Sequence, residues 1–268
     1  SFVGMFSKKH SNLKIANLGV STYSPSIYLS KVQHLINSEL NFTHVVVFID
    51  LSDIQNDSIL YEIDGNNVVR YRKNSKEYKN QLKQKQHKKK LINRMKQYIK
   101  DNFYLFTFMY LYLENKLYTK NKTVIEKNNA FNKPEAEWTY NIDSNRYGKL
   151  GVNEAINLSK IHMKKLYEVL NSKKIKLSIG VYPWPAQLLE KNLSNNKQSQ
   201  IWKEFCTNRC EMYIDTFPVF DQLINKFGVM KVYSDYFIDG DVHFNKKGNE
   251  IIFEVLDKKY KDYLASNN

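Results

Sequence analysis

The strongest chemical pattern in the chain is an Asp and a His two residues apart near its C-terminus, Asp241 and His243. In extended backbone, residues i and i+2 point to one side, about 6–7 Å apart along the chain. The Asp241 carboxylate can therefore orient one ring nitrogen of His243 and leave the other free as a base. Serine hydrolases need this arrangement, because a hydroxyl is a poor nucleophile until a neighbour takes its proton. A surface loop with no catalytic role, placed before a helix capped by Asn245, would have the same sequence pattern, so this interpretation is retained as an alternative.

Other polar residues follow apolar segments that have the length of strands. Ser1 opens the chain, Gly19 follows the segment 13–17, and Ser52 and Asp53 follow the segment 44–50. In a doubly wound sheet, ligands bind beyond the carboxyl ends of the strands. We therefore expect these residues to meet the Asp241 and His243 loop at that edge.

Trp184 and Gln187 follow the apolar segment 175–182 at the same predicted edge. They are candidates for lining a pocket there. A Trp between prolines is as often a packing residue, so both a pocket role and a packing role are retained as alternatives.

The elements that must position these residues alternate between strand-length apolar runs and helical periodicity. Strands are predicted over 13–17, 44–50, 175–182 and 212–215, and helices over 26–40, 153–171, 198–209 and 246–264. This order is typical of a three-layer α/β/α sandwich with a doubly wound, mostly parallel sheet. The segment 44–50 is continuous in β-branched residues, which predicts a central strand buried on both faces.

We expect one domain over 1–268, with an insertion at about 60–146 that caps the sheet. The insertion begins with a hairpin signal around Asp64 and Gly65. A basic helix and an aromatic helix ending near Tyr118 are predicted to follow. The apolar run 103–113 is too short for an ordinary transmembrane helix, which favours a buried or interfacial helix.

The order of these motifs resembles the SGNH/GDSL hydrolase superfamily, whose fold is flavodoxin-like. Ser1 and Phe2 are similar to the second half of its Gly-Asp-Ser-Phe/Leu block, Gly19 to its second block, and Asp241 and His243 to its last block. The resemblance covers the sheet and both ends of the chain, but not the insertion. It implies a preceding Gly-Asp and a first strand upstream of Ser1, where any targeting segment would also lie.

The resemblance implies that Ser1, Asp241 and His243 are the catalytic residues of a serine esterase or O-acyltransferase. Ser1 and Gly19 would donate backbone amides to the oxyanion, and Ser52 would stand where the family has an Asn donor. The family's mechanism requires no cofactor and no metal. The two activities share one acyl-enzyme, so both remain open, as does the compartment, whether bacterial cell envelope or cytoplasm.

The spacing of the last block narrows the expected substrate. Most relatives have Asp-x-x-His, whereas Asp241-x-His243 is similar to the branch of envelope polysaccharide O-acetyltransferases. We therefore expect an acylated glycan or lipid-linked substrate. Three alternatives remain: a degenerate domain that binds polysaccharide without turnover, a flavodoxin-like protein with coincidental polar residues, and an N-terminal nucleophile hydrolase, whose stacked antiparallel sheets the pattern does not favour.

The net charge of +14 is spread over a chain rich in Lys and Asn. The basic region near 73–100 is a candidate for association with a membrane surface, but its sparse aromatic residues do not favour nucleic-acid binding. The only two cysteines, Cys206 and Cys210, form no disulfide framework and no zinc site with other residues, and we expect free thiols.

Overall fold

The computed structural model describes residues 1–20, 22–63, 69–71 and 129–267. The chain divides into two compact units, one formed by Ser1–Arg70 with Asn129–Asn268 and the other by Tyr71–Asn128. The second unit lies almost wholly outside the described residues, as do the predicted basic and aromatic helices. The description that follows is therefore of the first unit.

The centre of this unit is a parallel sheet of three strands in the order β1-β4-β5. The strands are β1 (His44–Phe48), β4 (Lys176–Val181) and β5 (Tyr213–Asp215). Both pairings are parallel, with Val47 opposite Ile179 and Ile179 opposite Tyr213. The predicted mixed α/β class with a parallel sheet is confirmed.

The predicted strand over 13–17 is wrong, and within the described residues β1 does not have the central position that was predicted for it. Within the described residues β1 pairs only with β4, so it lies at an edge of the sheet, and its Val46 is 41% exposed. Residues 14–20 form neither helix nor strand. Leu13 and Ile15 instead pack against the core cluster around Ile214. Alternating apolar residues become a strand only beside a neighbour that accepts their backbone hydrogen bonds, and no described strand does so here.

A second, two-stranded sheet pairs β2 (Tyr61–Ile63) with β3 (Val69–Tyr71), in agreement with the predicted hairpin. The residues that connect the two strands, 64–68, lie outside the described residues. Both strands fall in the region predicted as an insertion.

Four predicted helices are confirmed, namely α2 (Pro25–Asn37), α7 (Gly151–Ser172), α8 (Lys197–Cys206) and α11 (Lys246–Asn267). Four others were not predicted, namely α1 (Phe2–Lys9), α3 (Asp53–Ile59), α9 (Phe217–Phe227) and α10 (Val229–Tyr236). Short 3₁₀ turns complete the unit: η1 (Pro134–Thr139), η2 (Asn145–Leu150), η3 (Pro185–Leu189) and η4 (Leu193–Asn195).

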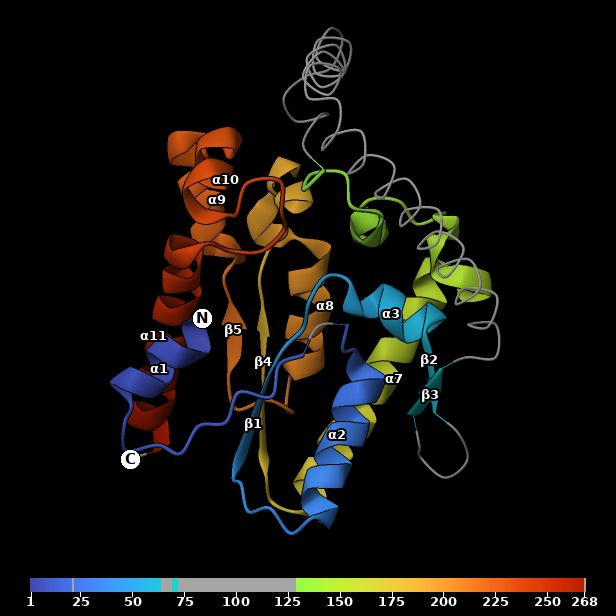
Figure 1. The fold of residues 1–268 in the computed structure, drawn as a ribbon, viewed down its shortest axis with the longest axis vertical. Coiled ribbons are helices and arrows are strands. Elements are labelled where there is room, and N and C mark those ends of the chain that lie inside the picture. The colour runs from blue at the N-terminus through green and yellow to red at the C-terminus, as the bar shows by residue number, and fades with distance from the viewer. Residues whose placement is uncertain (21, 64–68, 72–128, 268) are drawn as a thin grey trace, which may run out of the picture. The chain divides into compact units, whose positions relative to one another are not determined.

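Different helices cover the two faces of the sheet (Figure 1). On one face the Gln198 side chain of α8 donates to the carbonyl of Ile49, 3.1 Å away, just beyond β1. On the other face Ile214 of β5 packs in a cluster with Phe6 of α1 and Leu256 of α11. Helix α1 therefore lies against α11. Its first residue, Phe2, lies at the carboxyl end of the strands, beside Phe48.

A buried carboxylate holds three helices together beside the sheet. Asp57 of α3 accepts hydrogen bonds from the Ser24 hydroxyl and the Ser26 amide at the start of α2, each at 3.0 Å. It also accepts from Nδ1 of His162 on α7, 2.7 Å away. Each donor satisfies part of a charge that would be costly to bury alone.

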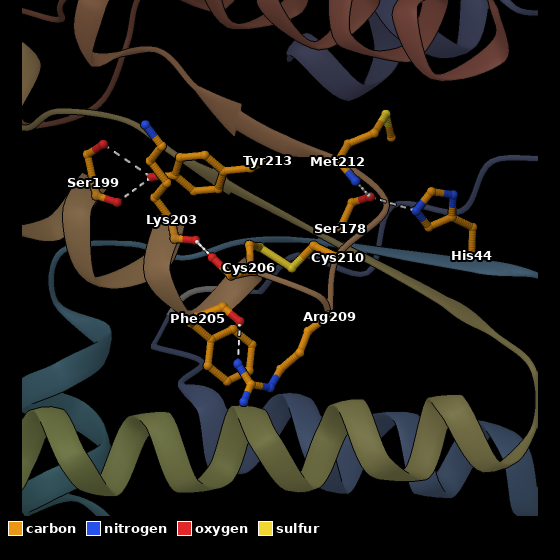
Figure 2. Close-up of a disulfide and its surroundings, with 11 residues drawn as sticks. His44, Ser178, Ser199, Lys203, Phe205, Cys206, Arg209, Cys210, Met212 and Tyr213 are labelled. Atoms are coloured by element: carbon orange, nitrogen blue, oxygen red, sulfur yellow. Dashed lines mark hydrogen bonds between the residues drawn. A yellow bond between two sulfur atoms is a disulfide. The ribbon is translucent and has the colours of Figure 1, made fainter. Parts of the chain in front are cut away.

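The prediction of free thiols is wrong, because Cys206 and Cys210 form a disulfide with their Cα atoms 4.8 Å apart (Figure 2). Helix α8 ends at Cys206, and Asn208 adopts a left-handed backbone conformation, with φ of 59°. The chain therefore folds back, so that the Cys210 amide donates to the Cys206 carbonyl at 3.0 Å. Helical spacing alone had not indicated this reversal.

Among the described residues, no helix combines the length and the apolar character needed to cross a bilayer.

Candidate active site

The Asp241 and His243 pair forms as predicted. His243 Nδ1 lies 2.8 Å from an Asp241 carboxylate oxygen. The Nε2 atom of the same ring makes no hydrogen bond among the described residues. The His243 side chain is 75% exposed and that of Asp241 is 45% exposed. A ring held at one nitrogen and open at the other has the geometry of a general base.

A short turn sets the direction of this pair. The bridge between Phe237 and Phe244 is antiparallel, and the Ile238 amide donates to the His243 carbonyl at 2.9 Å. Gly240, at φ of 72°, makes the reversal between them. Asn245 then accepts from the Gly248 amide at 3.1 Å, which is the helix cap that the sequence predicted for α11.

Partial burial raises the pKa of Asp241, but hydrogen bonds from the His243 ring and the Val242 amide outweigh it, so the pKa is lowered overall. The carboxyl group therefore stays ionised at neutral pH. An ionised partner stabilises the positive charge that the imidazole acquires when it takes a proton.

Ser1 is the N-cap of α1, and its Oγ accepts from the Gly4 amide at 3.4 Å. Accepting this bond leaves the hydroxyl proton available for donation. The next residue, Phe2, donates its amide to Oδ1 of Asn249 on α11, 3.1 Å away. The Asn249 amide group in turn donates to the Phe244 carbonyl at 3.2 Å, immediately after His243.

Aromatic contacts join the same segments. The Phe2 ring lies 4.6 Å from the ring of Phe48 at the end of β1, and Phe48 stacks 6.4 Å from Tyr182 at the end of β4. Tyr182 meets Phe244 edge to face at 5.6 Å. The start of α1, the carboxyl ends of two strands and the segment after His243 thus gather at one edge of the sheet.

Gly19 lies in an exposed segment, and its amide donates to Oδ1 of Asn17 at 3.1 Å. In this structure the amide that the family resemblance assigns to the oxyanion is therefore engaged within its own turn. Among the described residues, no hydrogen bond joins Gly19 to Ser1 or His243.

Ser52 is engaged in a similar way. Its hydroxyl donates to Oδ1 of Asp50 at 2.6 Å, and its amide donates to the same oxygen at 2.9 Å. The second oxygen of Asp50 accepts from the Tyr182 hydroxyl and from the Trp184 indole, each at 2.9 Å. Asp50 follows β1 and was not singled out from sequence; its place at the end of a predicted strand is the signal that could have found it.

Asp53 is buried, and one of its oxygens accepts from the Tyr28 hydroxyl at 2.6 Å and from the Asp50 amide at 2.9 Å. Burial raises the pKa of Asp53 well above its ordinary value, and the nearby Asp50 charge raises it further. Its role in this structure is to organise the turn after β1.

Trp184 is 8% exposed and Gln187 is 1% exposed. The Gln187 side chain accepts from the Trp184 amide at 2.8 Å and donates to Asn196 and Gln198. Together with the bond from the Trp184 indole to Asp50, these contacts agree with the packing alternative for both residues.

A polar hollow of about 540 Å³ lies at the opposite end of β4, lined by residues that include Ile175, Lys176 and Arg209. None of the predicted site residues lines it. In the part of the chain that the structure describes, no three His, Cys, Asp or Glu side chains are grouped so that they could hold a metal ion.

Comparison of the chain with protein-family models, with curated proteins and with solved structures finds no match. The case for a function therefore rests on the geometry of the site.

Proposed function

We propose that the protein is a serine-dependent ester hydrolase or O-acyltransferase in which Ser1, His243 and Asp241 act together. One observation carries the proposal: His243 is held by Asp241 through Nδ1 at 2.8 Å, with Nε2 open, on the segment that Asn249 joins to the start of α1. The residue before Phe2 is Ser1, so this connection brings the Ser1 hydroxyl to the edge of the sheet where His243 lies; among the described residues no hydrogen bond joins the two.

In the proposed reaction, Nε2 of His243 takes the Ser1 hydroxyl proton as Oγ attacks the ester carbonyl carbon. Collapse of the tetrahedral intermediate forms the acyl-enzyme, and the departing alcohol takes the proton from His243. A water molecule or a sugar hydroxyl then gives its proton to His243 and attacks the acyl carbon. Collapse of this second tetrahedral intermediate breaks the bond to Ser1 Oγ, which takes the proton from His243. Backbone amides of Ser1 and Gly19 stabilise the oxyanion once the Gly19 amide has released Asn17, while the Ser52 hydroxyl stays with Asp50.

We further propose that the sheet is part of a three-layer, doubly wound sandwich whose first strand precedes Ser1. The exposed Val46 of β1 supports it, because parallel sheets ordinarily have both faces covered, and the open edge of β1 leaves room for a further strand. The expected result is that the β1 amides that do not donate to β4 are protected from hydrogen exchange in a longer native chain, and not in residues 1–268 alone.

The substrate class remains an acylated glycan or lipid-linked ester, as the Asp-x-His spacing predicts. The first test measures hydrolysis of p-nitrophenyl acetate by the protein expressed with any native residues that precede Ser1. Ser1→Ala and His243→Gln should each lower kcat by about 10⁴-fold or more while the fold is retained.

Matched controls are Ser11→Ala and His34→Gln, since both residues are exposed and neither belongs to the proposed site. These variants should keep wild-type rates. Turnover that survives Ser1→Ala would remove Ser1 as nucleophile. Adding an oligosaccharide acceptor distinguishes the two activities, because a transferase yields acylated sugar in place of free acetate.

A second candidate function is a catalytically degenerate domain that binds polysaccharide. It is favoured by the engagement of two predicted oxyanion donors, the Gly19 amide with Asn17 and the Ser52 hydroxyl with Asp50. This candidate predicts retention of an acidic glycan in a salt-sensitive manner, with no Ser1-dependent ester turnover under any condition. The basic region near 73–100, a candidate for membrane association, lies outside the described residues.

A further inference from the structure

The feature with the greatest consequence beyond the three proposed catalytic residues is the side chain of Asn249 on α11. Its Oδ1 accepts from the Phe2 amide at 3.1 Å. Its Nδ2 donates to the carbonyls of Phe244 at 3.2 Å and Asn245 at 2.8 Å. One amide side chain therefore holds both the residue after Ser1 and the residue after His243.

The bridge joins segments that are far apart in the chain, since Phe2 and Asn249 are 247 residues apart. The Phe2 amide is one of the first N–H groups of α1, which have no partner within the helix. The side-chain oxygen Oδ1 of Asn249 accepts a hydrogen bond from the Phe2 amide, and Ser1 Oγ accepts one from the Gly4 amide. The orientation of the first turn of α1, and with it of Ser1, thus depends on α11.

The position of α11 at this point is itself tightly defined. A Cβ atom added to Gly248 would collide with the Tyr236 carbonyl and the Phe244 ring, so the first turn of α11 packs closely against the end of α10. The Asn245 side chain donates to the Asp235 and Phe237 carbonyls at 2.9 and 3.2 Å. Asn249 therefore projects from a rigid base.

We infer that Asn249 is a positioning residue that sets the Ser1 hydroxyl against the His243 ring for proton transfer. The inference rests on the proposed function and adds to it a fixed element outside the catalytic residues. Asn249 contacts neither the reacting atoms nor the Asp241 carboxylate, so it acts through the two backbone segments that it joins. The amide side chain of Asn249 offers both the acceptor and the two donor hydrogens that these segments use.

The test compares Asn249→Leu, Asn249→Asp and the exposed α11 control Glu254→Gln in p-nitrophenyl acetate hydrolysis. Asn249→Leu removes both halves of the bridge, and we expect kcat to fall about 10- to 100-fold with KM within about twofold, because small misplacements of reacting groups are costly. The pH at half-maximal kcat/KM should not move, since the Asp241 and His243 contact is intact. Glu254→Gln should match the wild type.

Asn249→Asp keeps the acceptor for the Phe2 amide but places a carboxylate against two carbonyl oxygens. It should retain protection of the Phe2 amide from hydrogen exchange, which Asn249→Leu should lose, and its kcat should fall. If Asn249→Leu does not fold, the kcat of Asn249→Asp tests the positioning role instead.

The outcomes separate the inference from the function on which it rests. Ser1-dependent turnover that is unchanged in both Asn249 variants overturns the positioning role and leaves the proposed function standing. A loss of kcat that scales only with a lower Tm, or that comes with an equal rise in KM, also overturns it. No Ser1-dependent turnover in the wild type overturns the proposed function and the inference together, even where the Phe2 amide is protected through Asn249.

Discussion

At the scale of single residues, the surroundings of each aspartate near the sheet edge differ, and they determine what each can do. Asp241 is half exposed, and its lowered pKa keeps a charge beside the His243 ring. Asp50 accepts four hydrogen bonds, two on each oxygen. Asp53 is buried, with a pKa raised by that burial. Only Asp241 is arranged to assist a base, while the other two shape the turn after β1.

The first prediction concerns Ser52, whose hydroxyl donates to Asp50 at 2.6 Å. Because this proton is already engaged, Ser52→Ala should lower kcat for p-nitrophenyl acetate by less than about 100-fold, the lower bound for loss of an oxyanion donor. The measurement is steady-state kinetics with the Tm monitored. A drop of about 10²- to 10³-fold at unchanged KM would show that Ser52 turns toward the oxyanion during the reaction.

At the scale of elements, α1 is anchored to α11 at both of its ends. The first turn is held by the bond from the Phe2 amide to Asn249. At the last turn Asp257 accepts from Lys9 at 2.9 Å and lies 2.8 Å from the His10 ring. Phe6 packs between them, 5.4 Å from the Tyr260 ring. A helix of eight residues has little stability alone, so these contacts decide where Ser1 lies.

The second prediction is that Asp257→Asn lowers the free energy of unfolding by about 2 kcal/mol at pH 7, because charge-assisted hydrogen bonds are lost. Although desolvation raises the pKa of Asp257, hydrogen bonds from Lys261, Lys9 and His10 lower it well below its ordinary value of 3.8. The stabilisation is therefore full above about pH 3.8 and is lost as the pH falls through the folded-state pKa.

Urea titrations at several pH values check this dependence. The difference between wild type and Asp257→Asn should shrink only in acid, below the ordinary carboxyl pKa. Asp262→Asn, an exposed residue of the same helix, is the control and should change little. A difference that persists unchanged at the lowest accessible pH would contradict the ionic origin of the anchor.

At the scale of the whole unit, a few buried polar hydrogen bonds connect the helices to one another and to the sheet. Asp57 joins the start of α2 to α7, and Gln198 joins α8 to the backbone beyond β1. The residues of the proposed site lie at the carboxyl end of the same sheet, near Phe48 and Tyr182.

The third prediction is that Asp57→Ala lowers the free energy of unfolding by about 3–5 kcal/mol, since it leaves buried donors without their acceptor. Burial raises the pKa of Asp57, but hydrogen bonds from His162 and Ser26 outweigh it and the pKa is lowered overall. The stabilisation should thus be present above pH 3.8 and decline as acid protonates the folded state. Calorimetry of this variant beside the exposed Asp143→Ala is the measurement; equal Tm values for the two would refute it.

Features that depend on local chemistry could be predicted from the residues alone. Periodicity predicted α2, α7, α8 and α11, and the i, i+2 spacing predicted the contact between Asp241 and His243, because neighbours in the chain need no tertiary partner to meet. The capping role of Asn245 was predictable for the same reason.

Features that depend on which distant segments become neighbours could not be predicted in this way. The folded chain was needed to show four features: the irregular backbone of residues 13–17, the edge position of β1, the disulfide between Cys206 and Cys210, and the hydrogen bond from Ser52 to Asp50. The bridge through Asn249 is the clearest case, since it joins residues 247 apart in the chain. A hydrogen-bond donor can be read from its residue type, but the acceptor that it meets is set by packing.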